Sequence, residues 1–169
     1  MPTAECVALL TELQGDTRAA PHQRASALRG LLDLEPSSAA PRIIAVLAGT
    51  DWTPKQVALE AIFSSRASGL TAALAAQLPT WDAPTQAAVI TALARRPDAT
   101  ITAAIVAATR HTAATVRTAA INALGDLPGD TSLVTLLATL GSSDTFDDAK
   151  LARAKIGRAS CRERVLRLV

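Results

Sequence analysis

Aromatic side chains are scarce in this chain of 169 residues: they make up 2% of it, with two Phe, two Trp and no Tyr. The core must therefore consist of Ala, Leu, Ile and Val. Two cysteines, Cys6 and Cys161, are too few for a disulfide framework or a zinc site. No run approaches the roughly 18 apolar residues of a membrane-spanning helix. The start of the chain shows no signal-peptide pattern, so we expect the cytoplasm by default.

Hydrophobic residues supply 49% of the chain and charged residues 19%, which is enough for a buried core. The apolar residues recur at a constant spacing of 31 residues, without an insertion. One column holds Leu28, Leu59, Ile90 and Ile121, a second holds Leu31, Ile62, Leu93 and Leu124, and a third holds Ala27, Ala58, Val89 and Ala120. A further column, Leu13, Ile44, Ala75, Val106 and Leu137, lies in the intervening segments. This regularity indicates one structural unit repeated along the chain.

The apolar spacing within each unit is helical, since residues 116, 120, 121, 123 and 124 share one face of a helix. Segments with Pro and Gly separate the helices. We predict five helix pairs, with first helices near 3–14, 40–48, 69–78, 99–109 and 131–140 and second helices near 19–33, 54–65, 84–95, 113–125 and 146–155. Helices of this length are marginal alone, so neighbouring pairs must cover one another. The expected fold is all-α: an α-solenoid with a 31-residue period.

Residues 115–130, TVRTAAINALGDLPGD, followed by Leu133, Leu136, Leu137 and Leu140, resemble a short bacterial HEAT repeat, also called the phycobilisome-lyase HEAT-like repeat. The apolar columns extend this resemblance over 1–155. It implies a superhelix of antiparallel helix pairs with the second helices on the concave side, commonly used as a protein-binding scaffold. The repeat serves many unrelated roles, so the resemblance says more about fold than about function.

The last residues carry the positive charge of the chain. Residues 156–165, IGRASCRERV, resemble the in-frame translation of a common short-read sequencing adapter. Residues 156–169 hold four Arg and one Glu, which leaves 13 basic and 14 acidic residues in 1–155. We expect a repeat region at 1–155, whose last repeat is cut short, and an adapter-derived or otherwise non-native tail at 156–169. The alternative is a native basic C-terminal helix.

A polar column at the same spacing is the leading candidate for a partner-binding surface: Arg24, Lys55, Gln86 and Arg117, with Asn122 nearby. The resemblance implies that such residues lie on the concave second helices. The alternative is an inter-repeat ladder of charges and hydrogen bonds. Trp52 and Trp81 occupy matched turns between helices and could anchor a partner, although each ring could instead cover the helix ends of its own unit.

No catalytic, cofactor-binding or metal-binding pattern is expected. His22 and His111 are about three repeats apart and neither has a neighbouring carboxylate cluster. Cys6 lies in the first predicted helix, where we expect a small buried side chain. We find no Gly-rich phosphate loop and no nucleophile motif in the sequence.

We therefore predict a non-enzymatic scaffold that binds a protein or peptide, with no cofactor, nucleic acid, membrane or small-molecule substrate. The net charge of residues 1–155 argues against nucleic acid. We expect the chain to be a fragment of a longer bacterial protein. Two alternatives stay open: a docking region of a larger enzyme, and a bilin lyase-type subunit, which the second family name implies.

Overall fold

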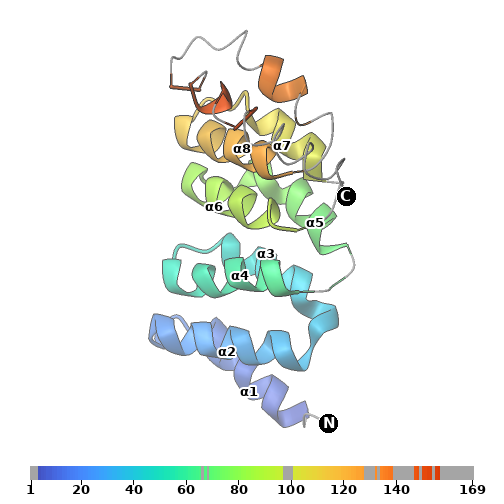
Figure 1. Ribbon diagram of the computed structural model, residues 1–169. Helices are drawn as coiled ribbons and strands as arrows, with labels where there is room; N and C mark the ends of the chain where they lie inside the picture. Colours follow the sequence, from blue (N-terminus) through green and yellow to red (C-terminus); the bar gives the residue numbers. More distant parts are fainter. Residues whose placement is uncertain are drawn as a thin grey trace. The chain divides into compact units, whose positions relative to one another are not determined.

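A computed structural model of the chain describes residues 4–65, 67, 69–96, 101–127, 132, 134–138, 147–148, 150–153 and 155–156. Every regular element within these residues is a helix, as predicted (Figure 1). The α-helices are α1 (Ala4–Gly15), α2 (Pro21–Leu34), α3 (Ala39–Leu47), α4 (Trp52–Ser64), α5 (Leu70–Gln77), α6 (Ala83–Leu93), α7 (Thr102–Ala108) and α8 (Ala114–Asp126), and the 3₁₀ turns are η1 (Pro36–Ser38) and η2 (Leu78–Thr80). None of the described helices is long and apolar enough to cross a bilayer.

The chain forms two compact units, unit 1 (Met1–Trp81) and unit 2 (Asp82–Val169). In unit 1, α1 packs on α2 and α3 packs on α4. The second helices α2 and α4 lie side by side, and so do the first helices α3 and α5 (Figure 1). Successive helix pairs therefore stack first helix on first helix and second helix on second helix, which is the arrangement of an α-solenoid.

In unit 2, α7 packs on α8, and the second helices α6 and α8 lie side by side. Further helical residues follow at 134–138 and 150–153. A methyl group built on Gly125 would lie 2.9 Å from the Cβ atom of Lys155, so the chain near residue 155 packs directly on the end of α8. The predicted tail begins at Ile156, which is helical, and residues 157–169 lie outside the described part of the chain.

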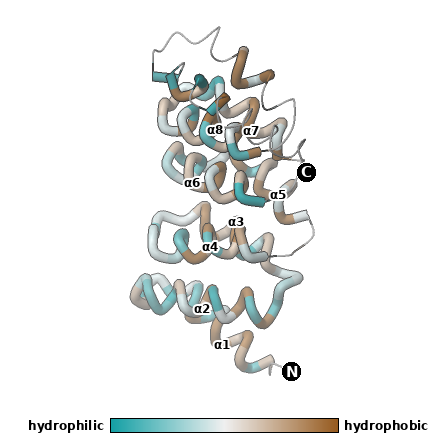
Figure 2. The backbone as a smooth tube through the Cα atoms, viewed as in Figure 1, coloured by the Kyte–Doolittle hydropathy of each residue, from teal (hydrophilic) through white to brown (hydrophobic). Residues whose placement is uncertain are grey.

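The apolar columns face the core of each unit, as their spacing predicts. All residues of the three second-helix columns are buried except Leu59, which is half-buried. Ile43, Leu74, Ile105 and Leu136 on the first helices are fully buried. Their neighbours Leu13, Ile44, Ala75 and Val106 are half-buried, and Leu137 is exposed. Figure 2 shows hydrophilic and hydrophobic residues following one another along α2 and α4, as expected when one face of a helix packs inward.

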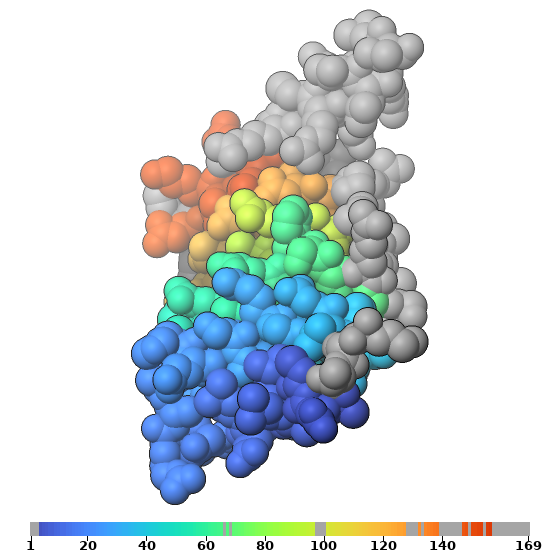
Figure 3. Space-filling model, turned by 90° about the horizontal axis from the view of Figure 1, so that it is seen from below, coloured from blue at the N-terminus to red at the C-terminus, as the bar shows by residue number. Residues whose placement is uncertain are grey.

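The first helix departs from the expected burial. Helix α1 contains no buried residue, Leu9 is 67% exposed, and Cys6 is exposed. Figure 3 shows α1 (dark blue) at the surface. The expectation that Cys6 is buried is wrong because α1 packs mainly on α2, where Leu10 lies against Gly30. Local helical periodicity does not indicate which faces of a terminal helix are covered.

Helix α5 contains a polar defect that leads to a stability prediction. The side chain of Thr71 is 2% exposed, and its hydroxyl oxygen has no hydrogen-bond partner. Burying an unpaired hydroxyl costs about 1–3 kcal/mol. We therefore expect Thr71→Val, which keeps the shape, to raise the free energy of unfolding by about 1 kcal/mol in urea denaturation. The same change at the exposed Thr118 should shift it by less than about 0.5 kcal/mol. A loss of stability in Thr71→Val would contradict this interpretation.

Candidate functional site

The predicted polar column lies on the second helices. Arg24 and Lys55 belong to α2 and α4 of unit 1, and Gln86 and Arg117 belong to α6 and α8 of unit 2. Lys55 is 4% exposed and Gln86 is 6% exposed. The side chains of Arg24 and Arg117 are 15% and 19% exposed. Side chains this deeply buried present little surface to a partner.

Arg24 links two successive repeats of unit 1. Its Nη2 atom donates a hydrogen bond to Oδ2 of Asp51, the residue before α4. The adjoining hollow of about 290 Å³ is lined by both residues and by Gln14, Thr17 and Thr50. The Nε atom of Arg24 is buried and has no hydrogen-bond partner. The guanidinium is therefore held by one carboxylate of the following repeat.

The pairing of Asp51 changes its role at the helix start. Asp51 and Asp82 stand 31 residues apart, and each precedes a helix with Pro in its first turn. Asp82 caps α6, because its Oδ1 accepts a hydrogen bond from the Thr85 amide at 3.0 Å. Asp51 occupies the equivalent position before α4 but makes no side-chain capping bond. Its carboxylate faces Arg24 instead.

Arg117 links two successive repeats of unit 2. Its Nε atom donates to Oδ2 of Asp148 at 2.7 Å, and Asp148 stands 31 residues further along the chain. Its Nη1 atom donates to the carbonyl oxygens of His111 and Thr112 at 3.1 and 2.9 Å. The ring of His111 also orders this turn, since its Nδ1 accepts from the Ala113 amide at 3.0 Å. One guanidinium thus ties the α7–α8 turn to the following repeat.

The two tryptophans do not occupy equivalent environments. Trp52 is the first residue of α4 and is 46% exposed. Trp81 follows η2 and is only 7% exposed. Trp81 therefore offers almost no surface to a partner, whereas Trp52 does. Asn122 lies on α8 and is half-buried.

Unit 1 contains a groove that the sequence patterns did not predict. It has a volume of about 460 Å³ and runs between the last turns of α2 and α4. Leu32, Val57 and Ala61 contribute its half-buried apolar floor. Arg29 and Glu60 pair across it, with 3.0 Å between Nη2 and Oε2, and their side chains are 62% and 72% exposed. The opposite charges of Arg29 and Glu60, 31 residues apart, were the available sequence signal.

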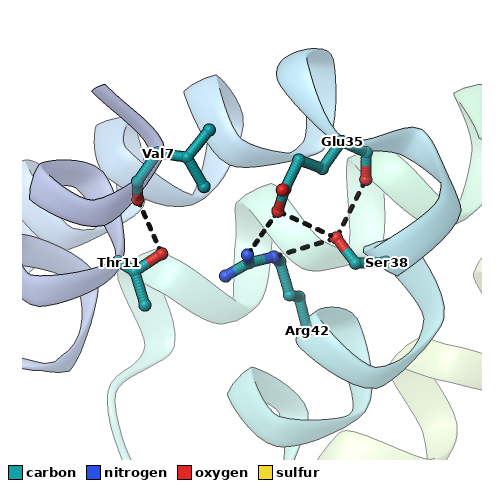
Figure 4. A network of polar contacts seen from close by, with 5 residues as sticks. All are labelled: Val7, Thr11, Glu35, Ser38 and Arg42. Atoms are coloured by element: carbon teal, nitrogen blue, oxygen red, sulfur yellow. Dashed lines mark hydrogen bonds and ion pairs between the residues drawn. The ribbon is translucent and has the colours of Figure 1, made fainter. Parts of the chain in front are cut away.

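The turn after α2 contains a separate polar network (Figure 4). Oε2 of Glu35 accepts a hydrogen bond from Arg42 Nη2 at 2.6 Å and lies 3.3 Å from the Ser38 hydroxyl. The same hydroxyl donates to the Glu35 carbonyl oxygen at 3.0 Å and accepts from Arg42 Nε at 3.2 Å. This network fixes the path from α2 into α3 and neutralises the Glu35 carboxylate.

Chemical groups that could form a metal site are not clustered in the described part of the chain. There, no three His, Cys, Asp or Glu side chains lie close enough together to hold a metal ion. His22 is exposed at the start of α2, and the ring of His111 accepts a hydrogen bond in the turn before α8.

Comparison with protein families identifies the repeat. Residues 71–155, just over half of the chain, match the model for HEAT repeats. The matched segment starts in α5 and includes α6, α7 and α8. A comparison with curated proteins gives no match to this chain.

Proposed function

The chain belongs to the HEAT repeat family, and on that basis we propose that it is a non-enzymatic helical scaffold that binds a protein or peptide partner. The observation that carries this proposal is the surface made by the side-by-side second helices α2 and α4. Exposed polar side chains there border a groove with an apolar floor. Such a combination of apolar floor and polar rim is typical of surfaces that recognise other proteins.

We assign different roles to the predicted site residues. Arg24, Lys55, Gln86 and Arg117 act mainly in holding the repeats together, which the two partly buried ion pairs and the low exposure of Lys55 and Gln86 support. Trp52 and Asn122 are the predicted residues that contact the partner. Trp52 is the stronger of the two, because an exposed tryptophan supplies a large apolar area at low entropic cost.

A peptide-display library tests the proposed function without knowledge of the natural partner. The immobilised chain is expected to enrich related peptides over an empty support, and these peptides should bind the soluble chain. Trp52→Ala should weaken that binding by about fivefold or more, as expected of an anchor residue. Leu9→Ala on α1, another exposed apolar side chain, is the control and should leave it unchanged. Failure to enrich any peptide over the empty support would count against the scaffold proposal.

A further inference from the structure

The groove between the last turns of α2 and α4 has a chemistry that selects among partners. Its volume of about 460 Å³ can hold one or two side chains of a peptide, and ligand sites commonly measure about 300–1,000 Å³. Leu32, Val57 and Ala61 are half-buried and leave apolar surface in its floor. An aliphatic side chain placed there would remove this surface from water, which favours binding.

Among the described residues, the rim of the groove carries one carboxylate with no ion-pair partner. Arg29 and Glu60 compensate each other across the groove. Glu35 is compensated by Arg42. Asp33 is exposed, lines the groove, and has no ion-pair partner among the described residues. The described side chains that line the groove therefore leave a negative formal charge.

Both helices add to this negative potential because both end here. Helix α2 ends at Leu34 and α4 ends at Ser64, and neither has a basic residue in its last turn. The carboxyl end of a helix carries a partial negative charge, which favours cations within about one turn. Two such ends lie beside Asp33 at one groove. Among the described groups, these three favour an incoming cation and disfavour an anion.

We propose that this groove binds a peptide segment of the partner protein in which an apolar side chain stands next to Lys or Arg. The apolar side chain occupies the floor formed by Leu32, Val57 and Ala61. The cation faces Asp33 and the carboxyl ends of α2 and α4. This inference rests on the proposed scaffold function and names the chemistry of the partner at one of its surfaces.

Two synthetic peptides test the inference on the full chain labelled with ¹⁵N. In one, leucine alternates with lysine over eight residues; in the other, glutamate replaces each lysine. The lysine peptide should shift the amide signals of Ala61, Ser64 and Ser65, which line the groove. We expect the glutamate peptide to bind at least tenfold more weakly. A higher salt concentration should weaken binding of the lysine peptide, because exposed charges are screened.

Variants separate the groove from the rest of the surface. Asp33→Asn should lower the affinity for the lysine peptide by about threefold to tenfold, in keeping with the loss of a partly exposed ion pair. Glu12→Gln, which removes the same charge from an exposed position of α1, is the matched control and should have no effect. Ala61→Leu should fill the floor and weaken binding without removing any charge. Neither groove variant should disturb its helix, because Asp33 is exposed and Leu is a good helix former. Circular dichroism verifies the helical content of both variants.

Several results would overturn the inference. The lysine peptide could fail to bind, or the two peptides could bind with equal affinity. Its binding could shift amide signals only outside the groove, or its affinity could stay unchanged in both Asp33→Asn and Ala61→Leu. If one of these results occurs while display-selected peptides bind at another surface, the groove inference fails and the scaffold function stands. If the library yields no binding peptide, the scaffold function itself fails.

Discussion

Replacing Leu31 with alanine is expected to lower the free energy of unfolding by about 2–5 kcal/mol. Leu31 lies on α2, is 0% exposed, and belongs to the apolar column that includes Ile62 on the neighbouring α4. The truncation removes buried methyl groups and leaves a cavity that rigid helices fill only partly. Urea denaturation followed by circular dichroism measures the loss.

The residue next in sequence provides the matched control. Leu32 is half-buried in the floor of the groove, so Leu32→Ala removes the same atoms from a site already reached by water. We expect its cost to stay below about 1.5 kcal/mol, since less apolar area is lost from the core. Equal losses in the two variants would contradict the assignment of Leu31 to the core face and Leu32 to the groove.

Replacing Asp148 with alanine is expected to lower the free energy of unfolding by about 3 kcal/mol, the lower end of the range of about 3–5 kcal/mol for breaking a buried ion pair. The side chains of Arg117 and Asp148 are 19% and 11% exposed. Removing the carboxylate leaves the guanidinium partly buried without its charge partner, although it keeps its bonds to the carbonyl oxygens of His111 and Thr112. Thermal and urea denaturation should both show the loss.

The Arg29–Glu60 pair tests the role of burial, because its residues are also 31 positions apart. Its side chains are 62% and 72% exposed, so Glu60→Ala should cost between 0 and about 1 kcal/mol. The double variant Arg117→Met with Asp148→Leu should recover part of the loss, because apolar residues of similar size often replace a buried pair without penalty, while the two bonds to the His111 and Thr112 carbonyl oxygens are lost. A similar cost for Asp148→Ala and Glu60→Ala would show that burial does not separate the two pairs.

The sequence by itself determined the helices and, except in α1, their inward faces. Predicted segments 40–48, 69–78 and 113–125 correspond to α3 (Ala39–Leu47), α5 (Leu70–Gln77) and α8 (Ala114–Asp126). These features depend on apolar periodicity and on Pro or Gly at the helix ends, which act over a few neighbouring residues. The constant spacing of 31 residues then placed each column on the same face in every repeat.

Only the tertiary structure decided the contacts of individual side chains. Asp51 and Asp82 both precede a helix with Pro in its first turn, yet Asp82 caps its helix while Asp51 faces Arg24 of the preceding repeat. Trp52 and Trp81 occupy similar turns, yet one is exposed and the other buried. A single sequence shows which face a side chain occupies. The hydrogen-bond partner and the exposure of that side chain depend on the neighbouring helix. The distance and orientation of that helix are set by packing between repeats.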